Sequence, residues 1–190
     1  ATDLFDALEL AQASPKVRDH FIELLAIRAG HDDADGFAAA VTRAGLMAAR
    51  LCLPYPNVCL KTPAATVEAI SDAHRAIWAD MVDTMDAMPG YGLAAVQIGV
   101  PLRLAVVDCS DERGQAVLMA NPEVLHASGQ FREHEEASPN LVGVSAVIRR
   151  PRAVTVRFMN AEGQIEERDF VNLWATSVQH QIDHLAGKMY

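Results

Sequence analysis

Residues 177–187 read Ser-Val-Gln-His-Gln-Ile-Asp-His-Leu-Ala-Gly and place two histidines, His180 and His184, four positions apart. The run contains no proline, and its apolar residues at 178, 182 and 185 recur at helical spacing. Side chains at i and i+4 of a helix lie on one face, about one turn apart. This spacing lets two imidazoles reach one zinc-like ion. We therefore predict a helix that offers two nitrogen ligands to a metal.

The residue that follows the first histidine limits what this helix can do. In the motif H-E-x-x-H, a glutamate at that position is the general base of metal-dependent hydrolases. Here the position is Gln181. An amide donates and accepts hydrogen bonds but takes up no proton near neutral pH. The helix thus keeps the ligand spacing of a metal hydrolase and lacks its base.

Composition excludes several classes of protein. The chain has 190 residues, a formal net charge of −9 and 51% hydrophobic residues, which is typical of a globular domain with a sizeable core. The acidic balance argues against nucleic acid as a partner, because binding phosphates needs a surplus of Lys and Arg. No apolar run approaches the ~20 residues that span a bilayer, so no membrane partner is expected. Cys52, Cys59 and Cys109 form no disulfide framework, which favours a reducing cytoplasm.

Two regions differ in their patterns. Helical patterns occupy residues 3–29 and then run from about residue 36 to about 51. They carry no chemical signature, so we expect residues 1–50 to be a helical extension that packs on the body or forms a homodimer. Residues 51–190 form the second region, which opens with a proline-rich break.

In the second region, helices and strands do not alternate along the chain as they do in a βαβ protein. Its pattern predicts an extended piece over residues 58–62 and an amphipathic helix over residues 66–88. Strands are predicted over residues 102–108, 116–121, 124–130, 153–159 and 165–171. The order of helices, hairpin-linked strands and one last helix indicates an α+β fold with antiparallel sheets.

Two motifs resemble those of the peptide deformylase family. Residues 90–99, Gly-Tyr-Gly-Leu-Ala-Ala-Val-Gln-Ile-Gly, resemble its first motif, G-x-G-L-A-A-x-Q-x-G, and residues 178–187 resemble its third, Q-H-E-x-D-H-L-x-G. The resemblance runs from about residue 53 to the last residue. It implies antiparallel sheets around the C-terminal HxxxH helix. It also implies a bacterial-type role in protein maturation, the metal-assisted removal of the formyl group from N-formylmethionyl peptides.

Several family positions carry over intact to this chain. The resemblance implies that Gln97 would hold the formyl oxygen and that His180 and His184 would be metal ligands. It also implies that Asp183 is the acid beside these ligands and that Gly90, Gly92 and Leu93 lie along the substrate. The implied cofactor is one divalent ion: iron, nickel or zinc. Glu136 matches the family's structural acid, and the resemblance implies that at least one of Arg149, Arg150 and Arg152 pairs with Glu136 or with a neighbouring residue.

The family's second motif, E-G-C-L-S, has changed here to Glu-Ala-Ser-Pro-Asn at residues 136–140. Ser138 replaces a cysteine thiolate, and a neutral hydroxyl is a poor ligand for a divalent ion. Pro139 has no N–H, and losing one donor to the developing oxyanion typically costs ~10²–10³ in rate. Gln181 removes the base, which is usually worth ~10²–10⁴. Two histidines and a hydroxyl should therefore hold an ion with reduced affinity or not at all.

Three functional hypotheses stay open. The first is a deformylase-like protein with lost or weak activity that keeps a pocket for a formylated peptide N-terminus or a similar small ligand. The second is an active metal-dependent amide hydrolase with a rearranged site, in which His134, Glu135 or Glu136 supplies a ligand or base. The third is a non-catalytic interaction protein whose function resides in residues 1–50.

Overall fold

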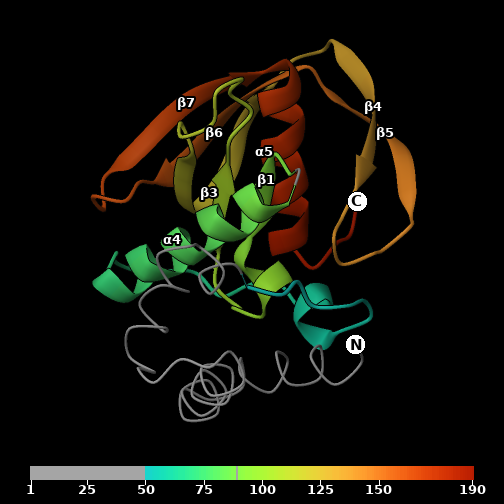
Figure 1. Ribbon diagram of the computed structural model, residues 1–190. Coiled ribbons are helices and arrows are strands. Elements are labelled where there is room, and N and C mark those ends of the chain that lie inside the picture. The colour runs from blue at the N-terminus through green and yellow to red at the C-terminus, as the bar shows by residue number, and fades with distance from the viewer. Residues whose placement is uncertain (1–49, 89) are drawn as a thin grey trace. The chain divides into compact units, whose positions relative to one another are not determined.

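The computed structural model describes residues 50–88 and 90–190 (Figure 1). The helical extension predicted for residues 1–50 lies almost entirely outside the described residues and stays a prediction. No helix in the described part is long and apolar enough to cross a membrane. The elements, in chain order, are η1 (Val58–Lys61), α4 (Asp72–Ala87), β1 (Gly92–Ala94), η2 (Ala95–Ile98), β2 (Leu104–Val107), β3 (Val117–Ala127), β4 (Phe131–Ala137), β5 (Ser145–Pro151), β6 (Ala153–Met159), β7 (Ile165–Val171) and α5 (Asn172–Leu185).

All strand pairs between these elements are antiparallel and form two sheets. The larger has five strands in the order β1-β2-β3-β6-β7, and β4 pairs with β5 in a separate two-stranded sheet. Helix α5 lies between the five-stranded sheet and the β4–β5 hairpin (Figure 1). This arrangement confirms the predicted α+β fold with antiparallel sheets around the HxxxH helix.

Strand β2 shows how the larger sheet carries a helix on each face. All four of its residues are buried. Leu104 and Val106 pack in the apolar cluster that contains the buried side of α4, whereas Ala105 and Val107 pack in the cluster that contains the buried side of α5. Successive side chains of a strand point to opposite faces of its sheet. The two helices therefore cover opposite faces, and α5 is fixed against the sheet by a continuous apolar core.

Helix α4 begins at Asp72, so the prediction of a helix from residue 66 was wrong for its first turns. Ser71 is the N-cap, and its backbone N–H donates to Nδ1 of His74 at 3.1 Å. The preceding residue Val67 is held by Asn121, whose Oδ1 accepts from the Val67 N–H at 2.9 Å and whose Nδ2 donates to the Val67 carbonyl at 2.7 Å. These two hydrogen bonds to Asn121 on β3 pair the backbone N–H and C=O of Val67, so Val67 does not need helical hydrogen bonds.

Three other elements differ from the sequence-based expectation. Of residues 58–62, predicted as extended, Val58–Lys61 form the 3₁₀ helix η1 and only Thr62 is extended. Oδ1 of Asn57 caps η1 by accepting from the Cys59 N–H at 2.9 Å. The two strands predicted at 116–121 and 124–130 are one strand, β3, with a register shift at Asn121 and Pro122. A proline cannot donate a hydrogen bond to the neighbouring strand, and this loss is tolerated at a β-bulge, where the hydrogen-bond ladder is already interrupted. The β4–β5 hairpin was not predicted.

Candidate functional site

A pocket of about 770 Å³ opens between the glycine-rich segment around β1, strand β4 with the loop after it, and one side of α5. Most residues that the sequence singled out line this pocket: Gly90, Gly92, Gln97, Ser138, Pro139, His180 and Gln181, together with His134, Glu135 and Glu136. Leu93 and His184 are fully buried and are not among the lining residues. The fold thus brings together segments that are 40 to 90 positions apart in the chain.

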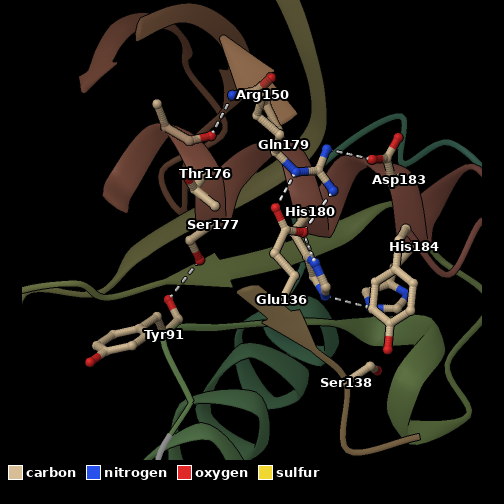
Figure 2. Close-up of polar contacts among 12 residues, drawn as sticks. Tyr91, Glu136, Ser138, Arg150, Thr176, Ser177, Gln179, His180, Asp183 and His184 are labelled. Carbon is tan, nitrogen blue, oxygen red and sulfur yellow. Dashed lines mark hydrogen bonds and ion pairs between the residues drawn. The ribbon is translucent and has the colours of Figure 1, made fainter. Parts of the chain in front are cut away.

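The two histidines of α5 face each other (Figure 2). Their Nε2 atoms lie 3.0 Å apart, and their rings are nearly perpendicular, with centroids separated by 4.6 Å. Nδ1 of His180 lies 2.7 Å from Oε2 of Glu136, an arrangement that fixes the ring orientation. Burial, followed by the nearby charge of His180, lowers the pKa of His184 to about 3. His184 is therefore neutral at physiological pH, the form in which an imidazole ligates a metal.

An ion network of Arg150, Glu136 and Asp183 contacts this histidine pair through Glu136 (Figure 2). Arg150 donates from Nε to Oε1 of Glu136 at 2.6 Å and from Nη2 to Oε2 at 2.9 Å, and its Nη1 donates to Asp183 at 2.7 Å. Burial alone would raise the pKa of Glu136, but the hydrogen bond with His180 and the pairing with Arg150 lower it to about 2. The expected pairing of Glu136 with a nearby arginine is confirmed. Glu136 is an ionised residue that positions His180.

Ser138 and Gln97 belong to a second buried network. Oε1 of Gln97 accepts from the Ala94 N–H at 2.8 Å, while its Nε2 donates to Oδ1 of Asn140 at 2.8 Å and to Oγ of Ser138 at 3.3 Å. Nδ2 of Asn140 donates to the carbonyls of Leu53 at 2.6 Å and Gln97 at 3.0 Å. Both hydrogens of the Gln97 amide are thus engaged within the protein. The sequence did not indicate these bonds of Asn140, because its partners are distant in the chain.

Gln181 is among the residues that line the pocket. Its side chain is buried, with an exposed fraction of 4%, and its Oε1 has no hydrogen-bond partner among the described residues. A Cβ at Gly92 would lie 2.8 Å from Nε2 of Gln181 and 2.8 Å from Oγ of Ser177, so only glycine fits there. Ser177 and Thr176 also line the pocket, and no sequence motif had indicated them.

The donor set fits a metal ion only in part. Two imidazole nitrogens that face each other suit a zinc-like ion. Ser138 does not complete the set, because its hydroxyl is neutral and is shared with Gln97 and Asn140. Among residues 50–88 and 90–190, no group of three His, Cys, Asp or Glu side chains is arranged to hold an ion. Glu136 is committed to Arg150 and His180.

Comparison with known proteins identifies relatives over the part of the chain that forms the pocket. The family model described as polypeptide deformylase matches residues 50–190. The peptide deformylase of Afipia carboxidovorans is 38% identical over 146 residues, which cover 76% of this chain and 85% of that protein. That of Phenylobacterium zucineum is 39% identical over 146 residues, which cover 76% and 86%.

Solved structures give the same result. The crystal structure of a peptide deformylase from Legionella pneumophila superposes with a TM-score of 0.71 and 34% identity, and covers 75% of this chain and 83% of that one. A Met-Ala-Ser-bound class I type b peptide deformylase from Acinetobacter baumannii gives a TM-score of 0.70 at 27% identity, and covers 75% and 96%. With the matched motifs in place around the pocket, the chain belongs to the peptide deformylase family.

Proposed function

We propose that this protein binds a formylated peptide N-terminus in its pocket and hydrolyses the formyl group weakly or not at all. The observation that carries this proposal is the position of Ser138. It stands where the family has its cysteine ligand, and its hydroxyl hydrogen-bonds with Gln97 and Asn140. Peptide deformylases are metal-dependent, and a neutral, engaged hydroxyl binds a divalent ion much more weakly than a thiolate.

The groups that would stabilise the reacting carbonyl are also altered. The side-chain N–H groups of Gln97 are used by Asn140 and Ser138, and Pro139 has no backbone N–H to donate. A developing oxyanion would therefore lack both donors that the family's second and first motifs supply. Each missing donor typically costs ~10²–10³ in rate.

Other residues keep roles in binding. The backbone of Gly90 and Gly92 borders the pocket, and Glu136 holds His180 at a fixed orientation. His180 and His184 are the two side chains that would ligate a divalent ion, which polarises the formyl carbonyl and water when it is bound. We propose a cytoplasmic site of action, because the three cysteines are free thiols.

A rearranged, active hydrolase is less consistent with the contacts of the acidic residues. Glu136 is held between Arg150 and His180, and its low pKa makes it a poor base. Glu135 is exposed, and its carboxylate accepts from Oγ of Ser145 at 2.7 Å. An interaction role for residues 1–50 stays a prediction.

The test uses the full chain, purified without chelator. Metal content is measured by mass spectrometry, binding of formyl-Met-Ala-Ser by calorimetry, and formate release with and without added Fe²⁺, Ni²⁺ or Zn²⁺. We expect saturable peptide binding with formate release near background. One equivalent of bound metal together with turnover would refute the loss of activity and direct attention to Glu135. Absence of peptide binding would refute the pocket's proposed role.

A further inference from the structure

We propose that His134 selects the first side chain of the bound peptide and favours one that ends in a neutral polar group of the primary carboxamide class, as in glutamine. This inference rests on the proposed function and adds to it the chemical class of peptide that the pocket takes. The sequence indicated His134 only as a metal ligand or base of a rearranged site. Its position in the fold supports a role in specificity instead.

His134 faces helix α5 from strand β4. More and less exposed residues alternate along β4, and His134 is on the same face as Glu136, two positions later. Glu136 contacts His180, and Tyr190, which follows α5, donates to the carbonyl of Val144 in the loop after β4. The end of β4 therefore lies toward the C-terminal end of α5, and the residues before Glu136 lie toward the N-terminal end of that helix.

This orientation places His134 beside Thr176. Two residues of a strand span about 6.6 Å, which equals the rise of about four residues of a helix. Thr176 precedes His180 by four positions, and both His134 and Thr176 line the pocket. A side chain of glutamine length would extend about as far from a formyl group held at His180, because bonds of about 1.3–1.5 Å join the atoms between them. The end of the first side chain would therefore lie between His134 and Thr176.

His134 has unused hydrogen-bonding capacity. It is half-buried, and its ring makes no hydrogen bond or ion pair within residues 50–88 and 90–190. A histidine ring carries at least one N–H in either tautomer. The Thr176 hydroxyl donates to the Asn172 carbonyl at 3.2 Å, so its hydrogen is used while its oxygen can still accept. The two side chains offer one donor and one acceptor, which match the C=O and NH₂ of a carboxamide.

The charges of the pocket favour a neutral group over an acidic one. Among the described residues that line it there is no arginine or lysine, whereas Glu135 and Glu136 are both present. A carboxylate on the ligand would meet these negative charges without a cation to offset them. Leu173, three positions before Thr176, also lines the pocket and suits the two methylene groups of a glutamine side chain.

The experiment measures the affinity of the full chain for formyl-Gln-Ala-Ser, formyl-Met-Ala-Ser and formyl-Glu-Ala-Ser by calorimetry at pH 7. Glutamine and methionine have side chains of similar length, and glutamate has the shape of glutamine with a negative charge. We expect the Gln peptide to bind at least about 3-fold more tightly than the Met peptide and about 10-fold more tightly than the Glu peptide. In His134→Leu the Met peptide should bind at least about 10-fold more tightly than the Gln peptide, because the carboxamide oxygen would be buried without a donor.

Two further variants are controls. His134→Asn keeps an N–H donor at this position and should keep the preference for the Gln peptide. His126→Leu is the matched control, because His126 is an exposed histidine on β3 that does not line the pocket. It should leave the wild-type order of affinities unchanged.

A wild type that binds the Met peptide as tightly as the Gln peptide, or more tightly, would overturn the inference and leave the proposed function intact. A preference for the Gln peptide that survives in His134→Leu would also overturn it, as would tightest binding of the Glu peptide. Absence of binding for all three peptides would refute the proposed function as well.

Discussion

Asn140 and Gln97 are joined by two hydrogen bonds of opposite direction. Oδ1 of Asn140 accepts from Nε2 of Gln97 at 2.8 Å, and Nδ2 of Asn140 donates to the Gln97 carbonyl at 3.0 Å. A third bond, at 2.6 Å, runs from the same Nδ2 to the carbonyl of Leu53. One buried amide therefore fixes the loop after β4 to η2 and to the segment that enters the domain. It also holds the Gln97 amide in a structural role.

Replacing Asn140 by Leu should destabilise the fold. The change keeps the size of the side chain but leaves Nε2 of Gln97 and the Leu53 carbonyl without this partner, and each buried unpaired group costs about 1–3 kcal/mol. We expect a loss of roughly 2–4 kcal/mol in the free energy of unfolding, measured by urea denaturation. Asn140→Ser, which keeps a hydroxyl, should lose less. Equal stability of Asn140→Leu and the wild type would show that the network contributes little.

Gly92→Ala should be disruptive, because the new Cβ would lie 2.8 Å from both Gln181 and Ser177 and 3.0 Å from the Val106 carbonyl. The backbone contact cannot move away without disturbing the β1–β2 pairing. We expect a loss of about 1–3 kcal/mol, as for other overpacked cores. Gly129→Ala is the control, since nothing lies within 4 Å of its Cβ position. Similar melting temperatures for the two variants would contradict the crowding at Gly92.

Much of the fold was predictable because its signals are local. The HxxxH helix, β6 and β7 follow from apolar spacing within a few residues, and the structure confirms them. The start of α4 was not predictable in this way. Apolar residues continue at helical steps before Asp72, but the Asn121 side chain holds Val67 from a strand 54 positions later. A long-range contact overrides a local pattern there.

The β4–β5 hairpin was missed for a different reason. Its strands are rich in charged residues, and only Glu136 on β4 and Arg150 on β5 are buried. The hairpin thus lacks the apolar alternation by which a half-buried strand is recognised. Those two residues pair with each other across the hairpin. The family resemblance predicted an arginine partner for Glu136 or a neighbouring residue, and left open which of three arginines it is. The Gln97–Asn140 bonds had no local signal, because the residues are 43 positions apart.

Arg150→Met should be among the most destabilising single changes in the ion network. It leaves the buried carboxylate of Glu136 with His180 as its remaining partner and removes the link to Asp183. Breaking a buried pair on one side usually costs ~3–5 kcal/mol. Arg157→Met is the matched control, because its ion pair with Glu123 is exposed, with side chains 46% and 61% accessible. Such a pair contributes about 0–1 kcal/mol, so comparable losses in both variants would contradict the network's importance.

Stability should fall in acid through Glu136. Its pKa is about 2 in the folded protein against its usual value of 4.5, so the folded state favours the ionised form. The resulting stabilisation, on the order of 3 kcal/mol, is present above pH 4.5 and is lost as pH falls toward 2. Denaturation at several pH values should show this slope, and Glu136→Gln should flatten it. A wild-type slope in that variant would assign the acid sensitivity to other carboxylates.

Restoring the family's residues one at a time should show how much each substitution in the site lowers metal affinity or activity. Ser138→Cys should raise zinc affinity, because it supplies a thiolate beside His180 and His184. Adding Gln181→Glu should then raise formate release from formyl-Met-Ala-Ser by up to ~10²–10⁴, and Pro139→Leu should restore one N–H worth ~10²–10³. These gains need not add, since the groups act on one transition state.

Asn140→Ser is the final step, because it frees an N–H of Gln97. Activity that rises before this step and is unchanged by it would mean that the Gln97 amide is already available to the substrate.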